Sequence, residues 1–385
     1  MTEIYLDNCA TTRPYDEVIA LCSRIQQENY ANPSSLHAKG IAAEKLLREA
    51  RRSVASLLHC REDELCFTSS GTEANNLAIK GIAYRRQRRH GHIITTQIEH
   101  PSVLNCCRRL EEEGFTVTFL PVDRQGCLDL DALADSIDSE TFLVSIIHLN
   151  NEIGTIQPVE EIGRIIKQRN PRTLYHIDGV QSFARIPVSL QQWQADLFSC
   201  SAHKIHGPKG TAALWIKKGV SLQPLFQGGE QERALRPGTE NTAAIAGFGL
   251  AARISGAAQN ENNALMHRLK DKLYRGLQTS GIEFYLNGPP LEKAAPHILN
   301  LSFPGVKAEV LLRFLEEKEI YVSAGSACHS RRPEPSHVLR AIALEEKRLS
   351  SALRFSFSSF NRFDEIDRVV EQIVPAVKKL KNCTP

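Results

Sequence analysis

From about residue 64, short apolar segments alternate with longer segments that carry apolar residues at helical spacing, and this alternation constrains the fold more than any other feature. Several short segments are apolar on both faces, as strands of a buried, mostly parallel sheet are. The alternation predicts a doubly wound α/β layer, whose ligands lie beyond the carboxyl ends of the strands. The predicted strands are 64–70, 92–98, 116–122, 141–150, 173–178, 197–203 and 211–216, and the predicted helices between them are 72–89, 101–114, 129–137 and 158–170.

The pattern changes after about residue 258, where a long polar helical segment, 259–281, is followed by shorter strands and helices and by a closing helix. A chain of 385 residues exceeds the size at which a single core usually stops growing. We therefore predict a large α/β domain over 1–258 and a smaller α+β domain with an antiparallel sheet over 259–385. The first ~15 residues are expected to be able to pack with the smaller domain.

Composition and charge exclude several classes of protein. The chain is 42% hydrophobic and 24% charged, which is ordinary for a globular enzyme and unlike a disordered or fibrous protein. The net charge of +3 is too small to indicate nucleic acid as a direct partner. The start, "MTEIYLDNCATT", has no signal-peptide features, and no later apolar run approaches the length of a membrane span, so we expect a cytoplasmic protein.

Polar residues follow several predicted strands, where the fold class brings side chains together. Ser70, Gly71 and Thr72 stand at a strand-to-helix turn, where backbone N–H groups and the helix dipole favour a phosphate. An ordinary helix cap also explains these residues when they are taken alone. His100 ends another strand directly before a proline that suits the first turn of a helix. A lone histidine at such a position is more often structural.

Two further strand ends carry an acid and a lysine. Asp178 ends an apolar run, where burial of its charge calls for a cationic partner. The next strand leads to Lys204 among small residues, and a buried lysine can form a Schiff base. Pyridoxal 5′-phosphate needs such a lysine, a carboxylate for its pyridinium nitrogen, a phosphate cradle at a helix start and a group against its ring. Since the strand ends supply all four, we predict that cofactor.

Two other motifs are not interpreted as sites. The stretch "GFGLAA", 247–252, fits G-x-G-x-x-A but lies inside a helical pattern with no preceding strand, so no dinucleotide site is predicted. The stretch "HKIH", 203–206, lacks the acidic partner and helical setting of a zinc protease. None of the ten cysteines forms a C-x-x-C pair or has zinc-finger spacing. No metal is predicted.

An ordered series of motifs runs almost from end to end of the chain. They are "YLDNCATT", "NPSSLH", "FTSSGTEANNLAIKG", "EHPSV", "HLNNEIGTIQP", "YHIDGVQS", "SAHKIHGPKG", "LRPGTEN", "GSACHS" and "LRFSFS". With these motifs the chain resembles the cysteine desulfurases of the NifS/IscS type, within the class-V aminotransferases of fold type I. The resemblance implies a mostly parallel seven-stranded sheet, a smaller C-terminal α+β domain and a homodimer.

The resemblance also implies a role for each strand-end residue. Lys204 would hold the cofactor through a Schiff base, Asp178 would pair with the pyridinium nitrogen, Gln181 would bond the phenolic oxygen, and His100 would stack on the ring. The implied phosphate ligands are Gly71, Thr72, Ser201 and His203, with Thr239 supplied by the neighbouring subunit. Asn151 and Arg354 would face the substrate and its carboxylate. Strand alternation independently points Arg354 away from an apolar layer, although a solvated strand arginine would show the same pattern.

The implied reaction converts L-cysteine to L-alanine, with Lys204 as a plausible base. Cys328 would take the sulfur as a persulfide and pass it to an acceptor protein for iron–sulfur cluster assembly or for tRNA or cofactor thiolation. The given sequence ends with "KKLKNCTP", and we expect no longer tail of the kind that some members use to dock a scaffold, so the acceptor is left open. Two alternatives stay open as well: a selenocysteine lyase, and a non-catalytic sulfur carrier or scaffold partner that retains only the fold.

Overall fold

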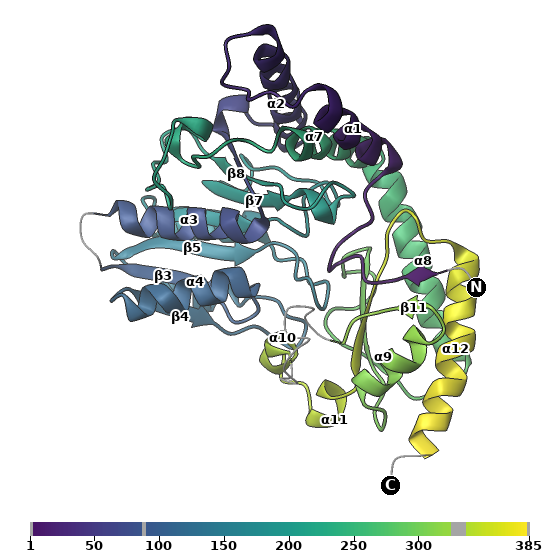
Figure 1. Ribbon diagram of the computed structural model, residues 1–385. Coiled ribbons are helices and arrows are strands. Elements are labelled where there is room, and N and C mark those ends of the chain that lie inside the picture. Colours follow the sequence, from purple (N-terminus) through teal and green to yellow (C-terminus); the bar gives the residue numbers. More distant parts are fainter. Residues whose placement is uncertain (1–2, 87–89, 325–335, 383–385) are drawn as a thin grey trace.

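The large sheet forms the centre of the computed structural model, which describes residues 3–86, 90–324 and 336–382 (Figure 1). Its strands lie in the order β2-β8-β7-β6-β5-β3-β4, and β8 alone runs antiparallel to its neighbours. The strands are β2 (Leu65–Thr68), β3 (His92–Thr96), β4 (Thr116–Leu120), β5 (Thr141–Ile147), β6 (Leu174–Asp178), β7 (Leu197–Ser201) and β8 (Ala212–Ile216). All seven predicted strands and the mostly parallel sheet are confirmed.

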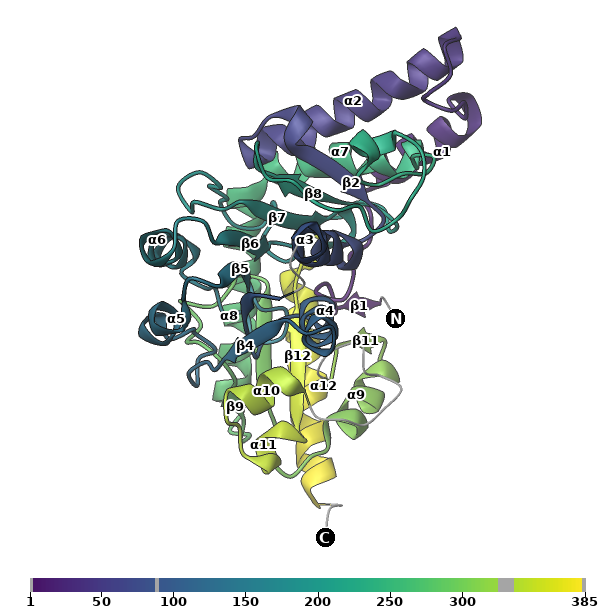
Figure 2. The same ribbon diagram turned by 90° about the vertical axis from the view of Figure 1, so that its left-hand side faces the viewer.

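Helices cover both faces of this sheet. α3 (Gly71–Arg85) and α4 (Pro101–Glu112) lie on one face, and α5 (Leu130–Ser136) and α6 (Val159–Arg169) lie on the other (Figure 2). α1 (Asp16–Glu28) and α2 (Ala38–Leu58) pack on α7 (Thr242–Ala257). Phe248 of α7, Val54 of α2 and Ile162 of α6 belong to one buried core, while a second core joins α3 and α4 to the opposite face. The "GFGLAA" stretch lies within α7, as expected for a helix and not for a dinucleotide turn.

The smaller unit has a three-stranded antiparallel sheet in the order β12-β10-β9. Its strands are β9 (Tyr285–Leu286), β10 (Ile298–Ser302) and β12 (Ala352–Ser356), and its helices are α8 (Gln259–Thr279), α9 (Ala308–Glu316), α10 (His337–Ala341), α11 (Glu346–Leu349) and α12 (Phe363–Asn382). Leu353 and Phe355 of β12 and Leu269 of α8 share its core. The predicted α+β character with an antiparallel sheet is confirmed.

The N-terminal segment connects the two units. β1 (Ile4–Tyr5) pairs in parallel with β11 (Ile320–Tyr321), and Asp7 then bridges to Ser356 of β12. Farther along the segment, Thr12 N–H donates to the carbonyl of His203, 2.9 Å away, in the large unit. α7 and α8 meet at Ala258, which caps both helices. Within the described residues, no helix combines the length and apolar character needed to cross a bilayer.

Candidate active site

The carboxyl ends of β6 and β7 meet at one edge of the large sheet because the two strands are parallel and adjacent. Asp178 is the last residue of β6 and pairs with Ser199 of β7. β7 ends at Ser201 and continues into a short 3-10 turn, Ala202–Lys204. The convergence predicted from the strand pattern therefore occurs, and it brings Asp178, Ser201 and Lys204 to the same edge.

Lys204 is held by backbone carbonyl groups of the N-terminal segment. Its Nζ donates to the carbonyl of Cys9 and to that of Ala10, the latter at 2.9 Å. The guanidinium of buried Arg185 donates to the Lys204 carbonyl at 2.7 Å and so fixes the backbone of the turn. Gln181 Nε2 donates to the same Cys9 carbonyl at 3.0 Å, which places Gln181 beside the lysine.

Asp178 is a buried carboxylate with two hydrogen-bond donors in place. Asn75 Nδ2 donates to its Oδ2 at 2.8 Å, and the Val180 N–H donates to its Oδ1 at 3.0 Å. Burial raises the pKa of Asp178, while these two hydrogen bonds and the charge of Lys204 act in the opposite direction. A carboxylate in this setting suits a cationic ring nitrogen as its partner.

His100 is a neutral imidazole at the start of α4. Burial, followed by the charges of Lys204 and His337, lowers the pKa of His100 to about 4. The side chain also caps α4, because Nδ1 accepts a hydrogen bond from the Ser102 N–H at 3.1 Å. A neutral, fixed ring beside Lys204 is suited to stacking on an aromatic cofactor.

The first turn of α3 and the end of β7 form a cradle that fits a phosphate. A Cβ built on Gly71 would lie 2.7 Å from Val180 Cγ2 and 3.8 Å from Ser201 Cβ, so only glycine keeps this approach open. The Ser201 hydroxyl is buried and has no hydrogen-bond partner among the described residues. The N–H groups of Gly71 and Thr72 belong to the first helical turn, which lacks intrahelical acceptors. An orphaned hydroxyl beside a helix start is what a bound phosphate would satisfy.

His203 lies at the same edge, next to Lys204. Its Nδ1 is 3.2 Å from Thr11 Oγ1, and its carbonyl accepts from Thr12 Oγ1 at 2.9 Å. Burial, then the charges of Lys204, Lys209 and His100, lowers the pKa of His203 to about 3. The imidazole is therefore neutral at physiological pH and can act on a phosphate only as a hydrogen-bonding group.

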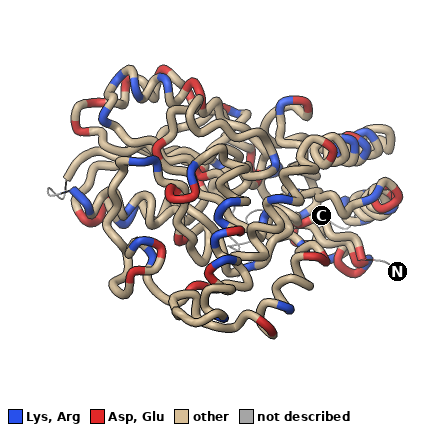
Figure 3. Tube along the Cα trace, turned by 90° about the horizontal axis from the view of Figure 1, so that it is seen from above, with Lys and Arg blue, Asp and Glu red and all other residues tan. Residues whose placement is uncertain are grey.

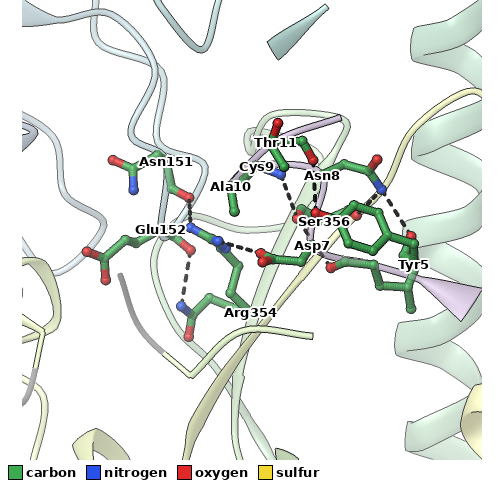
Figure 4. A network of polar contacts seen from close by, with 12 residues as sticks. Tyr5, Asp7, Asn8, Cys9, Ala10, Thr11, Asn151, Glu152, Arg354 and Ser356 are labelled. Carbon is green, nitrogen blue, oxygen red and sulfur yellow. Dashed lines mark hydrogen bonds and ion pairs between the residues drawn. The ribbon is translucent and has the colours of Figure 1, made fainter. Parts of the chain in front are cut away.

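Arg354 lies on the small-unit side of the site (Figure 4). Its Nη1 donates to the carbonyl of Asn151 at 2.9 Å, and its Nη2 donates to Asp7 Oδ1 at 2.7 Å. Nε has no hydrogen-bond partner among the described residues. The residue is only 1% exposed, which rules out the alternative of a solvated strand arginine. Asp7 thus holds a buried guanidinium that retains unused hydrogen-bonding capacity.

Two predicted site residues are not part of this cluster in the described structure. Thr239 is exposed and lines a surface groove together with Tyr30, Pro33 and Asn241. Cys328 lies outside the described residues. The flanking positions, however, are described: Ser323 exchanges backbone hydrogen bonds of 3.1 and 2.7 Å with Arg354, and Ser336 Oγ donates to the carboxylate of Glu152.

The sequence analysis missed the residues that support the cluster. Cys9 and Ala10 contribute carbonyl groups, which carry no side-chain signal, although the motif "YLDNCATT" that contains them was recognised. Asn75 lies one helical turn after Gly71 in "GTEANN", so its spacing from the phosphate cradle was the available signal. For Asp7, the only available signal was its position in the same N-terminal motif.

Comparisons with known proteins agree over nearly the whole chain. The model of the family "Aminotransferase class-V" matches residues 4–369. The chain is 42% identical over 382 residues to "Cysteine desulfurase IscS" of Methanosarcina thermophila, covering 99% of this chain and 94% of that protein. It is 41% identical over 384 residues to the protein of the same name from Clostridium botulinum strain Hall, covering 100% of this chain and 96% of that protein.

Solved structures show the same relationship. A structure named "NIFS-LIKE PROTEIN" superposes with a TM-score of 0.93 at 39% identity, covering 98% of this chain and all of that one. Another, named "SspA in complex with cysteine", superposes with a TM-score of 0.82 at 33% identity, covering 94% of this chain and 100% of that one. The fold is thus shared over nearly the whole chain, with about 40% of the residues identical in the relatives named above.

Proposed function

The chain belongs to the aminotransferase class-V family, and from that membership we propose its function. It is a pyridoxal-phosphate-dependent cysteine desulfurase, which converts L-cysteine to L-alanine and transfers the sulfur. The observation that carries this function is the meeting of Lys204, buried Asp178 and neutral His100 at one sheet edge. They meet in a chain that aligns with cysteine desulfurases over 99 to 100% of its length.

The residues of the cluster fit the parts of the cofactor. Lys204 would supply the amine, Asp178 would pair with the ring nitrogen, Gln181 would bond the phenolic oxygen, and His100 would cover one face of the ring. The orphaned Ser201 hydroxyl, the first turn of α3 at Gly71 and Thr72, and the neutral His203 would hold the phosphate. When bound, pyridoxal phosphate serves as an electron sink for the substrate Cα.

The remaining residues orient the substrate and move its atoms. Arg354, fixed by Asp7, would bind the substrate carboxylate through its free donors, with Asn151 beside it. Lys204 Nζ would take the proton from the substrate Cα. The thiolate of Cys328 would attack the substrate sulfur, so that a new S–S bond forms as the Cβ–S bond breaks and L-alanine leaves.

The anchors of the Cys328 segment support this role. Ser323 is bound to the backbone of Arg354, and His337 Nε2 donates to the carbonyl of Glu99, next to His100, at 2.9 Å. The segment between them therefore starts and ends beside the site. In the sequence Cys328 lies between these two anchors, four residues after Ala324. The persulfide would then pass to an acceptor protein in the cytoplasm, such as an iron–sulfur scaffold or a tRNA-thiolation enzyme.

A homodimer would complete the site. Thr239 faces a surface groove in one copy, so its implied contact with a phosphate requires a second copy. Tyr30 lines this groove and Leu36 follows soon after it in the sequence; their apolar side chains are 70% and 95% exposed and offer a contact surface.

Variants of the two reactive residues test the function. We expect the protein to absorb visible light after addition of pyridoxal phosphate. With a thiol added to reduce the persulfide, it should release alanine and sulfide from L-cysteine. Lys204→Ala should lose the absorption, whereas Cys328→Ala should keep it and lose sulfide release by at least about 100-fold. Cys127→Ala, which removes a partly buried thiol elsewhere in the chain, is the control.

Three results would contradict this assignment. Normal sulfide release by Cys328→Ala would exclude the proposed sulfur carrier. A rate on L-selenocysteine that greatly exceeds the rate on L-cysteine would indicate a lyase. No visible absorption with added cofactor would indicate the non-catalytic alternative.

A further inference from the structure

A continuous line of hydrogen bonds connects Asp178 to His100. Asn75 Nδ2 donates to Asp178 Oδ2 at 2.8 Å and to Ser102 Oγ at 2.9 Å. Ser102 Oγ in turn lies 2.8 Å from His100 Nδ1. Asn75 and Ser102 are buried, and they come from the two helices, α3 and α4, that cover the same face of the sheet. The line therefore joins the two groups that flank the expected cofactor ring.

The donors available along this line determine the direction of each bond. An amide nitrogen has two protons, and Asn75 donates one to Asp178 and the other to Ser102. Ser102 Oγ accepts from Asn75, so its own proton is available for His100 Nδ1. The Ser102 N–H also donates to His100 Nδ1, at 3.1 Å. Nδ1 is therefore an acceptor, and the single proton of the neutral ring must be on Nε2.

The opposite orientation of the Asn75 amide is unfavourable. It would place the amide oxygen against the Asp178 carboxylate and leave both acceptors facing one another. In the observed orientation Asn75 Oδ1 is buried and has no partner among the described residues. Leaving a buried acceptor without a hydrogen bond destabilises the folded state. The amide nitrogen therefore stays directed at Asp178 and Ser102, and the amide oxygen has no hydrogen bond among the described residues.

We propose that Asn75 and Ser102 are positioning residues that join Asp178 to His100 and fix the ring orientation and the Nε2–H tautomer of His100. The proposal rests on the proposed function, because it concerns the two groups expected to hold the cofactor ring. The link lets His100 present a donor at Nε2, and it supplies Asp178 with a fixed donor. The charged or titratable groups that face the pair are Lys204, Glu99, His203 and His337.

The first test uses two variants and a matched control in the cofactor-loaded protein. Asn75→Ala removes the donor to Asp178, and Ser102→Ala removes the hydroxyl link to His100. Asn76→Ala is the control, because the neighbouring Asn76 amide donates to the carbonyl groups of Thr72 and Ser102 and takes no part in the line. We expect kcat on L-cysteine to fall about 10-fold in both variants, with KM changed less than about twofold. Asn76→Ala should match the wild type.

Four further readouts separate positioning from a general structural effect. In Asn75→Ala the pH midpoint of the cofactor's visible absorption should differ from that of the wild type, because loss of a donor raises the pKa of Asp178 and so changes the charge beside the ring nitrogen. Nitrogen NMR of ¹⁵N-histidine-labelled protein, with His100→Gln to assign the signal, should show the Nε2–H tautomer. The double variant should be no slower than the slower single variant, since both changes interrupt one link. Ser102→Thr, which restores a hydroxyl, should recover most of the lost kcat.

The outcomes are distinguishable from failure of the proposed function, which the wild-type activity alone decides. An Nδ1–H tautomer in the wild type would overturn the proposal even if the enzyme is active. Strictly additive losses in the double variant, or variants that behave like Asn76→Ala, would overturn it as well. If Asn75→Ala fails to fold, two measurements still test the proposal. They are the tautomer of His100 in the wild type and the kcat of Ser102→Ala compared with that of Ser102→Thr.

Discussion

At the scale of a single residue, Glu99 is a carboxyl group buried directly before His100. Its Oε1 accepts from Thr96 Oγ1 at 2.6 Å and from the Ile147 N–H at 3.0 Å, while Oε2 has no partner among the described residues. Burial raises the pKa of Glu99 to about 8. The side chain is therefore mostly protonated at neutral pH, so no second full negative charge competes with Asp178 for the cations of the site.

This protonation predicts a pH-dependent stability difference. The folded protein binds the Glu99 proton more tightly than the unfolded chain, so the resulting stabilisation is complete below about pH 4.5 and is lost as the pH rises toward 8. Glu99→Gln keeps the shape and cannot ionise. We expect the wild type to lose stability relative to this variant by up to roughly 1.4 kcal/mol per pH unit between pH 5 and 8.

Urea unfolding at several pH values measures this difference. Glu309→Gln, which alters an exposed carboxyl group on α9, is the control and should track the wild type. Parallel stability curves for Glu99→Gln and the wild type would show that Glu99 is ionised in the folded protein.

At the scale of elements, the short helix α10 follows the segment that contains Cys328 in the sequence and packs on the large unit. Val338, Leu339 and Ile342 pack against Ile98 and Ile147 in a small apolar cluster between the units. Ser336 caps the helix, because its side chain accepts from the Leu339 N–H at 3.2 Å while it donates to Glu152. A helix of five residues depends on such a cap and on packing, because its own hydrogen bonds are few.

Loss of the cap is expected to weaken this attachment. Ser336→Ala should lower the free energy of unfolding by about 1 kcal/mol and reduce sulfide release from L-cysteine severalfold, with cofactor absorption unchanged. Ser350→Ala removes an exposed hydroxyl that bonds only within its own turn and is the control. Denaturant titration and sulfide assay together check the prediction, and equal behaviour of the two variants would contradict it.

The secondary-structure elements also show how much of the fold the alternating sequence pattern could predict. Each of the seven strands has a β-rich sequence and was found from that pattern, and all but β4 at the sheet edge are almost fully buried. The helices α1 and α2 were not predicted, because they pack mainly on α7 and not on the sheet, so their positions carry no strand-to-helix alternation. α3 ends at Arg85, so the predicted helix extended farther than the described one.

At the scale of the whole molecule, we propose Ala258 as the boundary between the two units, because it caps both α7 and α8. The N-terminal segment crosses between them and contacts both Lys204 and Arg354. Basic and acidic residues are interspersed along the described trace (Figure 3), so charge offers little guidance to a partner surface. The exposed apolar side chains near α1 and α2 indicate a contact surface better than charge does.

A charge placed on this apolar surface is expected to disrupt the proposed dimer. Leu36→Glu buries a carboxylate in a contact between copies, so sedimentation should show a shift from dimer to monomer and the protein should retain less cofactor. Val310→Glu, at an exposed apolar position on α9, should leave the mass unchanged. A dimeric Leu36→Glu variant with full cofactor content would place the interface elsewhere.

The sequence by itself determined the seven strands of the large sheet, the helices between them and the chemical types of the reactive residues, because periodicity and side-chain chemistry can be read from the residues. It also placed Asp178, Ser201 and Lys204 at strand ends, which a parallel sheet must bring to one edge. Only the tertiary structure decided which groups surround them. The carbonyls that bind Lys204 come from residues 194 and 195 positions away. Every residue has such a carbonyl, so only the path of the chain selects which of them meets the lysine.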